Sequence, residues 1–103
     1  MNPDEVRARR ANLQGAVEGA LLHPWMPQDI AADVLAQIRF ELGQMFGAVT
    51  DDEIGMAARR VLAEWRQRQF WQAAAHRKVI ETNWRRLQPL LGKAGAPVAG
   101  DFP

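Results

Sequence analysis

The sequence predicts an all-α protein, a small bundle of three to four helices with a flexible C-terminal tail. Apolar residues recur with a helical period through most of the chain, and two capping signals mark helix starts. Prolines and glycines separate the apolar stretches. A chain of 103 residues, 48% of them apolar, suits one domain of ordinary size. We assign residues 1–91 to a single helical domain and residues 92–103, rich in glycine and alanine, to the tail.

The first helix is expected to begin at Asn2, whose side chain can cap it, with Pro3 at the first helical position. Its apolar stripe consists of Val6, Leu13, Val17, Ala20 and Leu21. Pro24 and Pro27 end this helix, because neither can sit inside one. Trp25, between them, is expected either to close one end of the bundle or to serve as a contact point.

A second helix is expected to start at Pro27 and to stop at Gly47. One continuous apolar face marks it as a core element. The face consists of Ala31, Val34, Leu35, Ile38, Leu42 and Met45. Phe40 points away from this face.

The third start is a capping box, in which Thr50 caps the helix and Glu53 reaches back. Proline is absent from there to Pro89, so residues 51–88 permit either one long helix or two. The apolar stripe that starts at Ile54 ends at Trp65, is followed by polar positions, and resumes near Val79. We therefore favour a bend near residues 67–75 that redirects the chain into a fourth helix.

The composition argues against catalysis. The chain lacks cysteine, serine and tyrosine, so its only side-chain hydroxyls belong to Thr50 and Thr82. Acyl transfer by a serine or cysteine nucleophile beside a histidine is excluded. His23 and His76 have no metal-binding motif around them. We expect a protein that is not an enzyme and that uses neither a cofactor nor a metal.

Location and membrane contact can be judged from hydropathy. No apolar run approaches the roughly 18 residues that a bilayer crossing needs. The first ten residues are charged and lack the apolar region of a secretory signal. We expect a cytoplasmic protein with no membrane partner.

Charge is divided unevenly along the chain, although the net charge is only +1. Residues 1–55 hold four arginines and nine acidic residues, a net charge of −5. Residues 56–93 hold nine basic and two acidic residues, a net charge of +7. Separation of this kind can steer charged partners, although ordinary matching of helix dipoles also produces it.

The basic part of the chain interleaves arginines with aromatic residues, and on one continuous helix they fall into two neighbouring strips. The first strip consists of Arg59, Arg66, Phe70, Arg77 and Trp84, and the second of Arg60, Trp71, Lys78 and Arg85. We take nine residues of this part of the chain as candidate partner-binding residues: Arg59, Arg66, Phe70, Trp71, Arg77, Lys78, Trp84, Arg85 and Arg86. Arginine beside an exposed aromatic suits an acidic, partly apolar protein surface, and it equally suits phosphates and unstacked bases. The competing interpretation places Phe70, Trp71 and Trp84 in the core.

The sequence therefore favours a small non-catalytic regulator or adaptor, inhibitor-like in character, that binds an acidic surface of another protein. The same strips could instead pair with the acidic half of a second copy, giving a homodimer. The alternative function is nucleic-acid binding, with the same arginines on phosphates. The acidic first half weakens this alternative, because dedicated nucleic-acid binders are usually clearly basic.

Overall fold

The structure is a computed structural model, and it describes residues 2–23 and 26–95. These residues form four α-helices and two 3-10 segments, with no strand among them. The elements are α1 (Pro3–Leu21), η1 (Gln28–Ile30), α2 (Ala31–Phe46), α3 (Asp51–Gln67), α4 (Ala73–Leu87) and η2 (Gln88–Gly95). The predicted all-α bundle is confirmed.

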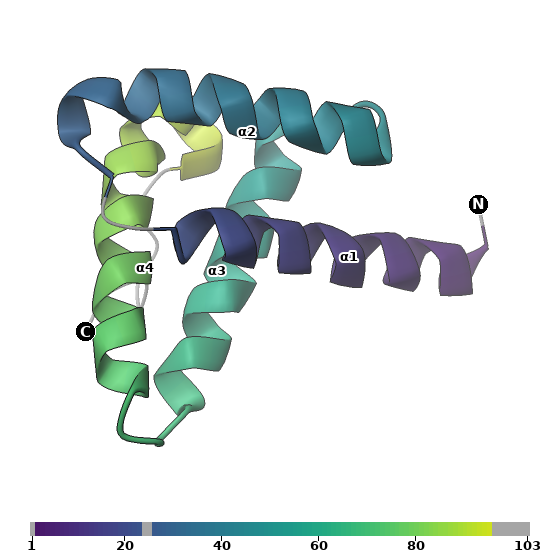
Figure 1. The fold of residues 1–103 in the computed structure, drawn as a ribbon. Coiled ribbons are helices and arrows are strands. Elements are labelled where there is room, and N and C mark those ends of the chain that lie inside the picture. Colours follow the sequence, from purple (N-terminus) through teal and green to yellow (C-terminus); the bar gives the residue numbers. More distant parts are fainter. Residues whose placement is uncertain (1, 24–25, 96–103) are drawn as a thin grey trace.

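Helix α3 is the centre of the bundle and packs against α1, α4 and η2. Figure 1 shows α4 returning beside α3 as a helical hairpin, α1 lying across α3, and α2 running along the top beside α1. The buried side of α3 consists of Ile54, Gly55, Ala57, Ala58, Val61, Leu62 and Trp65. The stripe that the sequence predicted for this helix is therefore its core face.

Polar side chains join α1 to α3 at three levels. Arg9 pairs with Glu53 near the start of α3. Gln14 donates to Glu64 at 2.8 Å, and Arg68 lies 3.8 Å from Glu18. Exposed polar pairs contribute little stability individually, but together they fix where α1 crosses α3.

The predicted helix signals are confirmed in atomic detail. The Asn2 side chain accepts a hydrogen bond from the backbone N–H of Glu5 at 2.8 Å. The Thr50 hydroxyl accepts from the N–H of Glu53 at 3.2 Å, and the Glu53 carboxylate accepts from the N–H of Thr50 at 3.1 Å. Gly47 ends α2 with a positive φ of 75°, a conformation that costs glycine nothing.

Residues 68–72 form the predicted bend, so residues 51–88 make two α-helices. Folding back lets Ile80, Trp84 and Leu87 enter the core, which a straight helix would leave in water. Arg77 strengthens the turn, because its guanidinium lies 3.4 Å from the carbonyl oxygens of Arg66 and Arg68 at the end of α3. Terminal carbonyls of a helix lack backbone partners, and a cation near them is favourable.

Three sequence expectations need correction. Met45 is 60% exposed, and the last buried residue of α2 is Leu42. Val6 is 40% exposed, and the buried stripe of α1 begins only at Leu13. Pro27 precedes a 3-10 turn, so the α-helical part of the second element begins at Ala31.

The C-terminal end of the described chain packs on α3. Residues 88–95 form η2, in which Leu91 and Gly95 are buried. Gly55 permits this contact, because a Cβ there would lie only 2.5 Å from the Ala94 carbonyl oxygen. The remaining residues of the predicted tail, 96–103, lie outside the described residues, as does Trp25.

In the part of the chain that the structure describes, the helices lack the length and apolar character needed to cross a membrane.

Candidate functional site

The bend interrupts both predicted strips, so the residues of each strip are divided between α3, the turn and α4. Trp84, from the first strip, is fully buried, so for this residue the core interpretation is correct. The guanidinium carbon of Arg59 lies 5.8 Å from the Trp84 ring centroid, and the same side chain donates to the Ala94 carbonyl at 3.2 Å. Arg59 and Trp84 therefore join α3, α4 and η2 inside the molecule.

Two further arginines of the first strip face the partner helix of the hairpin. The Nε of Arg66 lies 4.0 Å from the carboxylate of Glu81, and both side chains are less than a third exposed. Arg77 is held by the carbonyls at the end of α3. Both arginines contribute to the packing of α3 on α4.

Of the second strip, Trp71, Lys78 and Arg85 are exposed, whereas Arg60 on α3 is half-buried. Trp71, Ala75, Lys78, Thr82 and Arg85 follow one another at helical spacing, and all but the half-buried Thr82 are exposed. We name these five residues the α4 strip. Trp71 is 86% exposed, the highest value among the large apolar side chains of the described residues. The strip runs over fifteen residues, from Trp71 in the turn before α4 to Arg85 in its last turn.

Trp65 fixes the turn that carries Trp71. Phe70 packs edge-on against Trp65 at 6.0 Å between ring centroids, and His76 does so at 5.2 Å. The Arg68 guanidinium covers the Trp65 ring at 4.1 Å. Trp71 takes no part in this cluster, and Phe70 remains 49% exposed. The turn is therefore built without the Trp71 side chain, which is presented to solvent.

The far end of the α4 strip opens onto a polar hollow of about 310 Å³. Thr82, Arg85, Arg86, Gln28 and Pro89 line it. Two guanidinium groups beside a hydroxyl and an amide form a site suited to carboxylates or other planar anions. The α4 strip thus has an aromatic residue at one end and arginines at the other.

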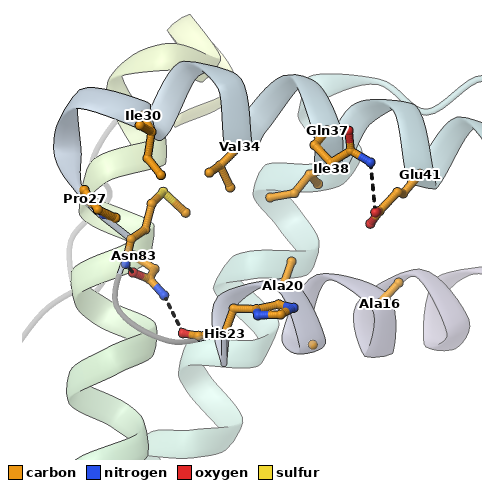
Figure 2. A pocket seen from close by; sticks show the side chains of 12 residues that line it. Ala16, Ala20, His23, Pro27, Ile30, Val34, Gln37, Ile38, Glu41 and Asn83 are labelled. Carbon is orange, nitrogen blue, oxygen red and sulfur yellow. Dashed lines mark hydrogen bonds between the residues drawn. The ribbon is translucent and has the colours of Figure 1, made fainter.

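A second surface feature, which the sequence did not predict, is a groove between α1 and α2 (Figure 2). Its volume is about 670 Å³, within the usual range of binding sites. Ala16, Gly19 and Ala20 form the α1 wall. On the opposite side Ile30 projects from η1, and Val34 and Ile38 project from α2. Individual apolar positions in a sequence do not reveal which two helices leave a gap between them.

Asn83 forms part of the groove's end and is fully buried. Its Oδ1 accepts from the backbone N–H of Met26 at 3.0 Å. Its Nδ2 donates to the carbonyls of Leu21 at 2.9 Å and His23 at 3.3 Å. Asn83 therefore fixes both sides of the α1–η1 connection against α4, and buried amides are stable only when paired in this way.

The rim of the groove is acidic on the α2 side. Glu41 lines the groove and accepts from Gln37 at 3.1 Å, and Asp33 lies one turn before Gln37 on the same side of the helix. Arg39, the only basic residue of α2, is paired with Asp51 at 2.8 Å and 3.0 Å. The groove's described lining residues include two carboxamides, an imidazole and one carboxylate, but no lysine or arginine.

No protein-family model, curated protein or solved structure matches this chain. Its function must be argued from its own residues.

Among the described residues, no three histidine, aspartate or glutamate side chains gather where a metal ion could be held. The pKa of Glu53 is lowered, first by the hydrogen bond from the Thr50 backbone and then by Arg9 of α1, and both partners hold Glu53 at the start of α3. The remaining candidates are two surfaces, one aromatic and basic, the other apolar with an acidic rim.

Proposed function

We propose that the protein is a small regulator or adaptor that binds an acidic, partly apolar surface of another protein through the α4 strip and the adjacent Phe70. In this role Trp71 inserts into an apolar depression of the partner, and Lys78, Arg85 and Arg86 pair with its carboxylates.

The exposure of Trp71 carries this proposal. A buried aromatic side chain removes about 150–250 Å² of its surface from water, which stabilises the fold. The bundle buries Trp65 and Trp84 in this way but leaves Trp71 exposed. Single exposed apolar residues are common, but Phe70 lies beside Trp71 and is itself half-exposed. Tryptophan and arginine are also the residues most enriched among binding hot spots.

The decisive experiment reverses the charge of the strip. We expect Lys78→Glu with Arg85→Glu to abolish partner capture from a native lysate while circular dichroism shows the helices intact, since glutamate forms helices about as well as arginine. Arg77 is left unchanged because it supports the turn. The matched control, Arg10→Glu with Lys93→Glu, makes the same change in net charge at exposed positions away from the strip. Equal capture by both double variants would refute the proposal.

Dependence on salt distinguishes a protein partner from nucleic acid. A single-stranded oligonucleotide bound through phosphates should lose affinity linearly with log salt, with a slope of about 0.7 for each phosphate neutralised. A protein interface anchored by Trp71 should respond less to salt and should weaken at least about tenfold in Trp71→Ala. A steep salt slope together with little effect of Trp71→Ala would replace protein binding with nucleic-acid binding.

A further inference from the structure

The partner that the α4 strip requires is an apolar hollow with negative charge at its edge, and the α1–α2 groove is mostly apolar and carries the Glu41 carboxylate. Building on the binding role proposed for the α4 strip, we infer that its partner is a second copy of this chain. Trp71 and Phe70 of one molecule enter the groove of the next, and the copies associate head to tail.

The groove has space for an incoming aromatic ring. A Cβ added at Gly19 would meet no other atom within 4 Å, so there is open space beside α1 at this point. The opposite wall offers Ile30, which is exposed, and Val34, which is half-buried. Each of these side chains would lose water contact beneath an indole.

Charge is complementary along the same line. Lys78 follows Trp71 by seven residues, from the turn into α4, and Glu41 follows Val34 by seven residues within α2, where that separation is about 10 Å. With an indole on Val34 and α4 running along α2, Lys78 lies toward the Glu41 side of the groove, where the two charges are opposite.

The pairing must occur between molecules. Figure 1 shows the α3–α4 turn at one end of the hairpin and α2 across the other end, so a molecule cannot fill its own groove with its own Trp71. The two contacting surfaces differ, which makes the interface heterologous. Such contacts close into a ring or continue as an open chain. A pair joined by one such contact leaves one groove unoccupied, and also one tip, by which we mean the exposed Trp71 and Phe70.

Light scattering after size exclusion, from about 10 μM to about 1 mM, covers the range of weak protein association. The wild-type mass should rise with concentration. Trp71→Ala, which removes the tip, and Gly19→Leu, which fills the groove, should each remain monomeric throughout. Gly43→Leu is the control, because Gly43 is also a helical glycine with open space around it, is exposed, and is absent from the groove. It should associate as the wild type does.

Mixing the two monomeric variants tests the head-to-tail geometry. Trp71→Ala keeps its groove and Gly19→Leu keeps its tip, so the mixture should form one heterodimer and stop there. A mixture that stays monomeric would refute this geometry. A wild type that is monomeric at every concentration would refute self-association and leave the groove to another occupant. In that case, capture from lysate that still depends on Lys78 and Arg85 would support the proposed function alone.

Discussion

At the scale of single residues, Thr50 supplies the best-defined local interaction in the molecule. Its hydroxyl accepts a hydrogen bond from the backbone N–H of Glu53, one of the four N–H groups that have no backbone partner at the start of a helix. We expect Thr50→Ala to lower the free energy of unfolding by about 0.5–2 kcal/mol, the usual cost of losing a cap. Chemical denaturation checks this value. Thr50→Ser keeps the hydroxyl and should lose much less, so an equal loss in both variants would contradict the capping role.

Glu53 makes the stability of the same helix cap depend on pH. Its pKa is lowered in the folded protein, first by the Thr50 backbone hydrogen bond and then by Arg9. A carboxyl group with a lowered folded pKa adds stability that is present above its unfolded pKa and is lost as pH falls through the folded value. Wild-type stability should therefore fall on acidification below about pH 4.3, the ordinary pKa of glutamate.

The variant Glu53→Gln isolates this contribution. It should be less stable than the wild type at pH 7, and the difference should shrink as pH falls towards 3. Thermal unfolding across this range measures the effect. Arg9→Met leaves the hydrogen bond between Thr50 and Glu53 in place. Its loss of stability at pH 7 should therefore be smaller than that of Glu53→Gln. A gap between wild type and Glu53→Gln that stays constant with pH would exclude the proposed linkage.

Sequence reasoning succeeded at positions governed by local chemistry and failed where tertiary contacts decide. Asn2 and Thr50 could be assigned as caps because a cap needs only its own first turn. Asn83 gave no local signal, because its three partners lie 57–62 residues earlier in the chain. Trp84 and Trp71 look alike in sequence, and only the fold buries one and exposes the other.

At the scale of helices, α2 offers a sharp contrast between its two faces. Leu35 is fully buried, whereas Phe40 is exposed. We expect Leu35→Ala to destabilise the protein by about 2–5 kcal/mol, because it leaves a cavity in the core. Phe40→Ala should change stability by less than about 0.5 kcal/mol. Denaturant titration of both variants provides the measurement, and a similar loss in the two would mean that the face of α2 is wrongly assigned.

The bend between α3 and α4 shows what a hydrophobic pattern can and cannot predict. The polar interruption after Trp65 indicated that a straight helix would leave the core, and the structure confirms two helices. The pattern could not predict which residues face each other once the chain turns back. Arg66 and Arg77 were therefore assigned to a partner surface, but they contact Glu81 and the end of α3.

At the scale of the whole molecule, the charge separation along the chain is only partly a separation in space. Arg9 and Glu53 pair within the acidic half, while Arg68 and Glu18 pair across the two halves. The acidic rim of α2 and the basic α4 strip remain as distinct surfaces. Their arrangement, like the α1–α2 groove, depends on how the helices pack and could not be predicted from helical periodicity.

Asn83 also has a consequence for the order in which the molecule folds. Its hydrogen bonds close loops of about sixty residues, whereas Trp65 and His76 meet across a short turn. Long loops cost more entropy to close, so the hairpin of α3 and α4 should form first and the α1–η1 connection should join it after the transition state.

Asn83→Ala should then accelerate unfolding and leave the folding rate nearly unchanged, whereas His76→Ala should slow folding. Stopped-flow measurements over a range of denaturant separate the two rates. Slower folding in Asn83→Ala, with unfolding unaltered, would place the junction of α1 and α4 in the folding nucleus.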